Sequence, residues 1–228
     1  MKEAEGYTHP TIGMTFPKVT VETTRGRKTL PDDFQGKWFV LFSHPGDFTP
    51  VCTTEFIAFQ QYQEDFNKMG TELIGLSVDQ VYAHLKWIEW IHDNTQIGIT
   101  FPVIADPLGR LSKMLGMLPE GQGTRTVRGV FIVDDSGTIR QTLFYPEEIG
   151  RSVQEIWRSV HALQTASLFN VAMPENWPHN QMLGSDVILP PAGNIKEIQK
   201  RMEGEKQGEY NCLDWWFCYK SLSAFSDK

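Results

Sequence analysis

The sequence predicts an α/β fold, with a mixed central sheet that has helices on both faces, followed by a C-terminal extension. Two observations predict it. Short apolar runs alternate with segments of helical periodicity up to about residue 170, and prolines then interrupt any long regular element. The chain has 228 residues, 40% hydrophobic and 21% charged, which is typical of a globular protein with a sizeable core. We therefore expect a domain at residues 1–170 and an extension at residues 171–228.

The expected elements alternate along the first 170 residues. The strands are an early hairpin around residues 25–27, buried runs at 37–43, 71–78 and 101–105, and a hairpin of 127–133 with 138–145. The helices are 52–69, 81–92, 108–117 and 149–170. In the helix at 81–92 we expect the apolar face to be formed by Leu85, Ile88 and Ile91 with Trp87. This order suggests a thioredoxin-like fold.

The extension combines one short expected helix, residues 195–202, with a dense aromatic stretch. Residues 211–219 (NCLDWWFCY) hold two cysteines and the cluster Trp215, Trp216 and Phe217. An exposed apolar patch of this kind marks an interaction surface, so we expect the extension to pack on a neighbouring subunit. Packing within its own chain is the alternative.

Charge and composition exclude several functions. The formal net charge is −7 and no basic face is evident, which argues against nucleic-acid binding. No apolar run is long enough to span a membrane, and residues 1–10 lack a signal peptide, so we expect no membrane association and a cytoplasmic location. Three cysteines do not make a disulfide framework, which points to reactive or metal-binding thiols.

One cysteine lies where thiol chemistry is favoured. Cys52 falls in the first turn of the expected helix at 52–69, directly after a strand, and a helix N-terminus stabilises the reactive thiolate. Thr49 is near enough to hydrogen-bond Cys52 or an incoming oxygen ligand. Pro45 and Pro50 stiffen the connecting loop, and Pro50 suits a helix start. A buried, inert cysteine is the alternative on local sequence.

The motif around Cys52 resembles that of a known enzyme family. The pattern Pro45-x-x-x-Thr49-x-x-Cys52, within residues 42–55 (FSHPGDFTPVCTTE), is similar to the active-site motif of peroxiredoxins of the one-Cys-like subgroup, including archaeal members with two extra C-terminal cysteines. The similarity continues at residues 77–79, 101–106, 128–134 and 186–191. It implies a thiol-dependent peroxidase that needs no metal or organic cofactor.

The resemblance also implies a role for individual residues. Cys52 would attack the peroxide, with Pro45 shielding it, Thr49 hydrogen-bonding the peroxide and Arg128 stabilising the thiolate. By itself, an arginine at a strand start is usually a solvated surface charge. Three further residues resemble supporting groups of the family: Glu55, Arg151 and His44. Each has a plainer interpretation, as a helix-terminus charge or a structural hydrogen-bonding histidine.

Peroxide attack leaves a sulfenic acid that must return to the thiol, usually through a disulfide. Cys212 and Cys218 are the candidates, and local sequence favours neither. The resemblance favours Cys218 as the resolving cysteine, with Cys212 as an exchange partner. A zinc half-site with His179 is a weak alternative, because the cysteine spacing is not compact.

The expected partners follow from this chemistry. They are hydrogen peroxide or an organic hydroperoxide, a thioredoxin-like or other dithiol reductant, and a second copy of the chain in a homodimer that assembles into a ring such as a decamer. A thioredoxin-like disulfide oxidoreductase is the rival function, but no second cysteine follows Cys52 closely. A holdase chaperone role is an additional alternative.

Overall fold

The structure, a computed structural model, describes residues 9–119, 123 and 125–225. Residues 1–8, part of the segment on which the expected absence of a signal peptide rests, lie outside the described residues. The chain divides into two compact units between Trp157 and Arg158. This division lies inside helix α4 (Val153–Phe169), whereas the sequence suggests a boundary after residue 170. Helix α4 is continuous across this division, and it ends one residue before the boundary suggested by the sequence.

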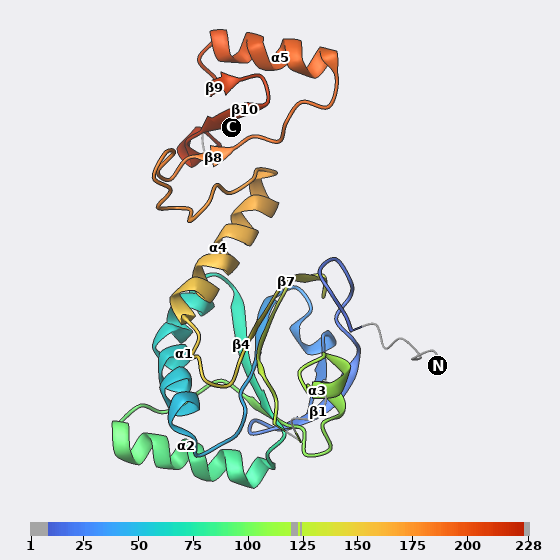
Figure 1. Ribbon diagram of the computed structural model, residues 1–228, viewed down its shortest axis with the longest axis vertical. Coiled ribbons are helices and arrows are strands. Elements are labelled where there is room, and N and C mark those ends of the chain that lie inside the picture. Colours follow the sequence, from blue (N-terminus) through green and yellow to red (C-terminus); the bar gives the residue numbers. More distant parts are fainter. Residues whose placement is uncertain (1–8, 120–122, 124, 226–228) are drawn as a thin grey trace. The chain divides into compact units, whose positions relative to one another are not determined.

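The first unit is built on a seven-stranded mixed sheet in the order β2-β1-β5-β4-β3-β6-β7. Strands β3, β4 and β5 are parallel, and the other pairs are antiparallel. Helices α1 and α2 lie on one side of this sheet and α3 on the other, which confirms the expected architecture (Figure 1). The elements are β1 (Val19–Thr23), β2 (Lys28–Leu30), the short 3-10 helix Asp32–Phe34, β3 (Trp38–Ser43), α1 (Pro50–Lys68), β4 (Thr71–Ser77), α2 (Val81–Thr95), β5 (Val103–Ala105), α3 (Arg110–Met114), β6 (Arg128–Val133) and β7 (Ile139–Tyr145). No helix in the described part of the chain is long and apolar enough to cross a membrane.

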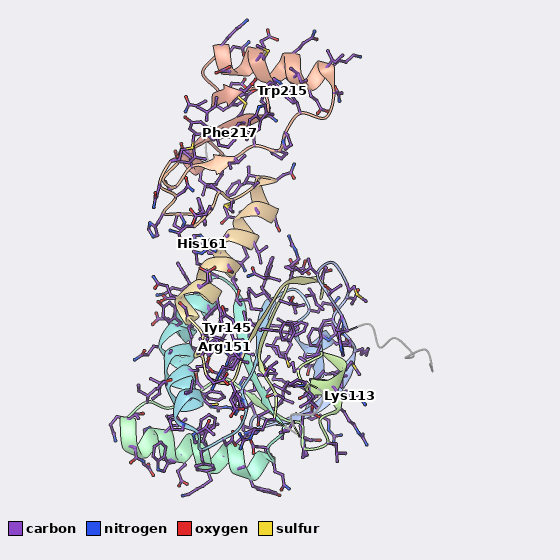
Figure 2. All side chains as sticks on the ribbon, viewed as in Figure 1. Lys113, Tyr145, Arg151, His161, Trp215 and Phe217 are labelled. Atoms are coloured by element: carbon purple, nitrogen blue, oxygen red, sulfur yellow. A yellow bond between two sulfur atoms is a disulfide. The ribbon has the colours of Figure 1, made fainter. Side chains whose placement is uncertain are left out.

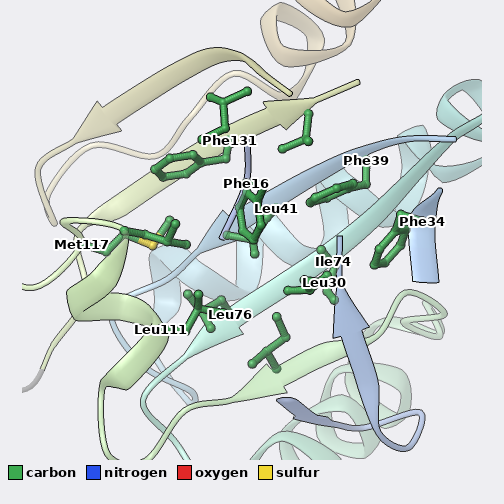
Figure 3. Close-up of a cluster of buried hydrophobic side chains, with 14 residues drawn as sticks. Phe16, Leu30, Phe34, Phe39, Leu41, Ile74, Leu76, Leu111, Met117 and Phe131 are labelled. Carbon is green, nitrogen blue, oxygen red and sulfur yellow. The ribbon is translucent and has the colours of Figure 1, made fainter. Parts of the chain in front are cut away.

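The central strand β3 is buried along its whole length, because it packs against cores on both faces of the sheet. Phe39 and Leu41 belong to the cluster of apolar side chains in Figure 3. Phe42 points to the opposite face and stacks on Phe59 of α1, with ring centroids 3.7 Å apart. This packing fixes the start of α1 beside the end of β3 and so determines where the loop of residues 44–49 lies.

Two elements of the first unit differ from the sequence expectation in an instructive way. The buried face of α2 consists of His84, Trp87 and Ile91, whereas Leu85 is 47% exposed. The apolar pattern identified Trp87 and Ile91 correctly but missed His84, because a polar residue occupies that position of the buried face. Helix α3 ends at Met114, three residues earlier than expected, and Gly116 follows with a φ of +71° that a right-handed helix does not accommodate.

The second unit has its own small core and a three-stranded antiparallel sheet in the order β8-β10-β9. Its elements are β8 (Val187–Ile188), α5 (Ile195–Lys206), β9 (Asn211–Asp214), β10 (Phe217–Lys220) and the 3-10 helix Leu222–Phe225. The core gathers Trp177, Val187 and Cys218. Trp177 also donates from its ring nitrogen to the carbonyl of Ser185 at 2.9 Å, which ties the proline-rich segment to this core.

The aromatic stretch at 211–219 forms the hairpin β9–β10, closed by a disulfide between Cys212 and Cys218. Both sulfur atoms are therefore joined to each other, and His179, the third residue of the alternative zinc half-site, is exposed. Trp215 and Trp216 lie in the turn of this hairpin, 38% and 55% exposed (Trp215 is labelled in Figure 2). The second unit therefore buries its own core, whereas Trp215 and Trp216 remain partly exposed to solvent in the single chain.

Candidate active site

Cys52 occupies the first turn of α1, as the sequence predicts. The helix begins at Pro50 after Thr49, whose backbone is extended. The Cys52 side chain is fully buried and its thiol is free. The unpaired N–H groups of this first turn give the surroundings of the sulfur a partial positive charge, which favours a thiolate.

Arg128, the first residue of β6, brings a full positive charge to the same sulfur. Its Nη1 atom lies 3.4 Å from the Sγ atom of Cys52. The Nε and Nη2 atoms donate to the carbonyl oxygen of Glu147 at 2.9 and 2.7 Å, and Nη1 also donates to Glu55 at 2.7 Å. The Arg128 side chain is 2% exposed. The guanidinium is therefore held from both sides in one orientation, in contact with the sulfur.

Glu55 joins Arg128 to Arg151 in a buried ionic group. Its carboxylate accepts hydrogen bonds from the Arg151 backbone N–H at 2.7 Å, from Nε at 2.8 Å and from Nη2 at 2.6 Å. Burial alone would raise the pKa of Glu55, but the hydrogen bonds and charge of Arg151 and the charge of Arg128 hold that pKa below its ordinary value. Glu55 therefore stays ionised and keeps both arginines in place. Figure 2 labels Arg151, which precedes α4.

A pocket of about 430 Å³ opens beside this group. Pro45, Thr49, Val51 and Arg128 line it, together with Pro50, Glu147 and Glu148. The hydroxyl of Thr49 donates to the carbonyl of Gly46 at 2.8 Å, so its lone pairs remain available to accept a hydrogen bond. Pro45 is buried and, lacking an N–H group, presents an apolar wall. The pocket thus offers a cation and a hydrogen-bond acceptor to a small oxygen-containing ligand.

His44 does not line this pocket but belongs to a neighbouring buried network. Its Nε2 atom lies 2.8 Å from Asp47, whose second carboxylate oxygen lies 2.7 Å from Nδ1 of His84. These three residues are the group in the described part of the chain that could hold a metal ion by proximity. Each Asp47 oxygen is already hydrogen-bonded to a ring nitrogen, however, so the contacts are those of a hydrogen-bond network.

The structure thus brings Cys52, Arg128, Glu55 and Arg151 into one contact group, with Pro45 and Thr49 at the adjoining pocket. The tail cysteines lie in the second unit, where Cys218 is 1% exposed. Sequence reasoning missed three contributors. Glu147 acts through its backbone carbonyl, which leaves no signal in the sequence. The sequence did contain a signal for Asp47 and His84. A histidine at a buried position of α2 requires a buried hydrogen-bond partner, and that partner is Asp47.

The chain is similar to known proteins over most of its length. Residues 12–142 match the model of the AhpC/TSA family. The chain is 56% identical to a peroxiredoxin of Thermotoga maritima over 213 residues, covering 93% of this chain and 98% of the relative. It is 55% identical to a peroxiredoxin of Methanocaldococcus jannaschii over 215 residues, 93% and 99% of the two chains.

Solved structures give the same result. A yeast mitochondrial 1-Cys peroxiredoxin superposes with a TM-score of 0.79 at 34% identity, over 92% of this chain and 98% of that one. A peroxiredoxin 6 of Arenicola marina gives a TM-score of 0.79 at 30% identity, over 92% and 97%. A reduced 2-Cys peroxiredoxin of Plasmodium vivax gives 0.70 at 28% identity, over 78% and 93%.

Proposed function

Since the chain belongs to the AhpC/TSA family of peroxiredoxins and is a thiol-dependent peroxidase, we propose that Cys52 is the residue that attacks the peroxide. The observation that carries this assignment is the contact between the Cys52 sulfur and Nη1 of Arg128, 3.4 Å apart at the start of a helix. Both the fixed cation and the helix terminus favour the thiolate, which is the nucleophilic form. The rival function of a disulfide oxidoreductase is not favoured.

The proposed reaction is an in-line displacement at oxygen. The Cys52 thiolate attacks the terminal oxygen of hydrogen peroxide or an organic hydroperoxide, the S–O bond forms and the O–O bond breaks. The leaving oxygen takes up a proton and departs as water or an alcohol, while the sulfur becomes a sulfenic acid. Arg128 stabilises the charge that develops on the oxygens, Thr49 accepts a hydrogen bond from the peroxide, and Pro45 limits access of water.

We further propose that the sulfenic acid is resolved by Cys218 of a neighbouring subunit. The Cys218 thiol displaces water from the Cys52 sulfenic acid and forms an intersubunit disulfide. The Cys212 thiol then attacks Cys218, which releases the Cys52 thiolate and leaves the Cys212–Cys218 disulfide. That pair lies at bonding distance in the hairpin β9–β10. A dithiol reductant finally returns both tail cysteines to thiols, so two electrons pass from the reductant to the peroxide.

Several features support the proposed partners and organisation. The exposed Trp215 and Trp216 favour residues 171–228 as an extension that covers a neighbouring subunit of a homodimer, with residues 1–170 as the peroxidase domain. A ring such as a decamer is the proposed larger assembly. The yeast relative is described as resolved through glutathione and thioredoxin systems, which supports a thioredoxin-like or other thiol reductant here. We propose a cytoplasmic location, where such reductants are abundant.

A non-reducing gel tests the resolving step. The fully reduced protein and its Cys212→Ser and Cys218→Ser variants each receive one equivalent of peroxide. We expect Cys212→Ser to accumulate a disulfide-linked dimer, because the exchange that breaks the intersubunit bond is blocked, and Cys218→Ser to form none. Loss of the dimer in Cys212→Ser alone, or an intrachain bond to Cys52 found by peptide mapping, would show the resolving assignment to be wrong.

A further inference from the structure

A fully buried network adjoins the active-site loop, and the mechanism above does not use it. Its centre is Asp47, in the loop between β3 and α1. One carboxylate oxygen lies 2.8 Å from Nε2 of His44, and the other lies 2.7 Å from Nδ1 of His84 on α2. The side chains of both histidines are 0% exposed and that of Asp47 is 1% exposed.

Hydrogen-bond geometry determines where the protons of His84 are. Its Nε2 atom lies 3.1 Å from the carbonyl oxygen of Ile104, which can only accept, so Nε2 carries a proton. Burial would raise the pKa of Asp47, but hydrogen bonds from His44 and His84 hold that pKa below its ordinary value, so Asp47 is a carboxylate. Nδ1 of His84 faces this carboxylate at hydrogen-bond distance, so a second proton there would make His84 the cation that pairs with Asp47.

The same network fixes the state of His44. Burial lowers the pKa of His44, so its ring is neutral and holds a single proton. That proton is on Nε2, because Nε2 faces the Asp47 carboxylate. Nδ1 is consequently an unprotonated, buried atom with no hydrogen-bond partner among the described residues. Asp47 thus selects one of the two tautomers of His44.

Asp47 also anchors the loop through its backbone. Its N–H donates to Asp79 at 2.9 Å, and Asp79 is held by the hydroxyl of Ser77 at 2.8 Å. The hydroxyl of Thr126 donates to the carbonyl of His44 at 2.6 Å. The charged and titratable groups gathered around His84 are therefore Asp47, Asp79 and His44. The anchored loop includes Pro45 and Thr49, two residues of the pocket.

We propose that His84 is a positioning residue of the peroxidase site: as a buried cation it holds Asp47, and through Asp47 it holds His44, Pro45 and Thr49 in the arrangement that receives the peroxide. The proposal rests on the assignment of Cys52 as nucleophile. A buried carboxylate without its cation is strongly disfavoured. A neutral side chain at position 84 would therefore leave Asp47 to take up a proton and release His44, and the loop would lose its anchor.

Neutron diffraction from the wild-type protein at neutral pD tests the charge directly and requires no variant. We expect deuterium on both ring nitrogens of His84, on Nε2 alone of His44, and on neither oxygen of Asp47. A His84 ring with one deuterated nitrogen, or a deuterated Asp47 carboxyl, overturns the proposal. This readout is independent of catalysis, so it separates failure of this inference from failure of the assignment of Cys52.

Kinetics test the positioning role. His84→Gln is compared with His92→Gln, an exposed histidine of the same helix, by measuring the single-turnover rate of Cys52 oxidation and the rate of Cys52 alkylation from about pH 5 to about pH 8. Alkylation requires only the thiolate, whereas oxidation also requires the positioned loop. We expect the ratio of oxidation to alkylation to fall about tenfold or more in His84→Gln, and further at low pH as Asp47 takes up its proton.

The control His92→Gln should keep the wild-type ratio at every pH. Adding Asp47→Asn to His84→Gln should remove the additional pH dependence, because the carboxyl that titrates is gone. An unchanged ratio in a folded His84→Gln variant overturns the positioning role. If Cys52 is not oxidised even in the wild type, the proposed function is at fault rather than this inference.

Discussion

Replacing Glu55 by glutamine should destabilise the protein strongly, since Glu55 is the single anion between two buried cations. Its carboxylate accepts four hydrogen bonds, one from Arg128 and three from Arg151, whose side chains are 2% and 0% exposed. A glutamine amide keeps one acceptor oxygen and turns an NH₂ group towards guanidinium donors. Removing one partner of a buried ionic group costs about 3–5 kcal/mol, a large share of a typical stability of about 5–15 kcal/mol.

Equilibrium unfolding in denaturant measures this loss, with Glu64→Gln as the matched control on the same helix. Glu64 pairs with Lys68 at the surface, where solvent screens the charges, so the control should have nearly wild-type stability. The pKa of Glu55 is lower in the folded protein than in the unfolded chain, where it is about 4.3. The contribution of Glu55 to the free energy of unfolding is therefore fully present above the unfolded pKa and is lost as the pH falls through the folded pKa. A loss of unfolding free energy below about 1 kcal/mol in Glu55→Gln at neutral pH would refute this reasoning. A loss that stays the same in acid would also refute it.

Three further predictions concern separate parts of the first unit. Arg128→Ala should retain the fold by circular dichroism but slow the oxidation of Cys52 by peroxide about a hundredfold, because the charge that develops on the peroxide oxygens loses its cation; an unchanged rate removes Arg128 from the mechanism. Phe59→Ala should lower the free energy of unfolding by about 3–5 kcal/mol through loss of the stacked contact with Phe42, and a loss below about 1 kcal/mol would contradict this packing. Asp134→Ala should cost about 1–3 kcal/mol, because this carboxylate accepts the hydrogen bonds that close the β6–β7 hairpin. Burial would raise the pKa of Asp134, but those bonds lower it, so the cost should shrink as the pH falls below about 4, and a pH-independent cost would contradict this.

The sequence allowed the central sheet and α1 to be predicted because local and tertiary signals agree there. Strand β3 is apolar throughout, and the aromatic repeat of α1 matches the face that packs on Phe42. The buried face of α2 was predicted only in part, at Trp87 and Ile91, because His84 is polar and Leu85 is apolar, while tertiary contacts bury the first and expose the second. Periodicity of hydrophobic residues detects burial only when the buried residues are hydrophobic.

The candidate site was foreseeable only in part for a similar reason. Side-chain chemistry and motif resemblance pointed to Cys52, Arg128 and Glu55, which the structure brings into contact. The carbonyl of Glu147 that orients Arg128 belongs to the backbone and is the same for any residue type. The Cys212–Cys218 pairing depended on the hairpin between the two cysteines, which sequence analysis treated as one continuous stretch.

The central claim is that Cys52 is the nucleophile, and one equivalent of peroxide added to the reduced Cys212→Ser/Cys218→Ser double variant tests it most directly. Peroxide consumption is followed by stopped flow, and the oxidised residue is located by peptide mass spectrometry. The account predicts that each chain consumes one peroxide and gains one oxygen atom on Cys52, and that adding Cys52→Ser abolishes consumption. An added oxygen on another residue, or undiminished consumption after Cys52→Ser, would contradict it.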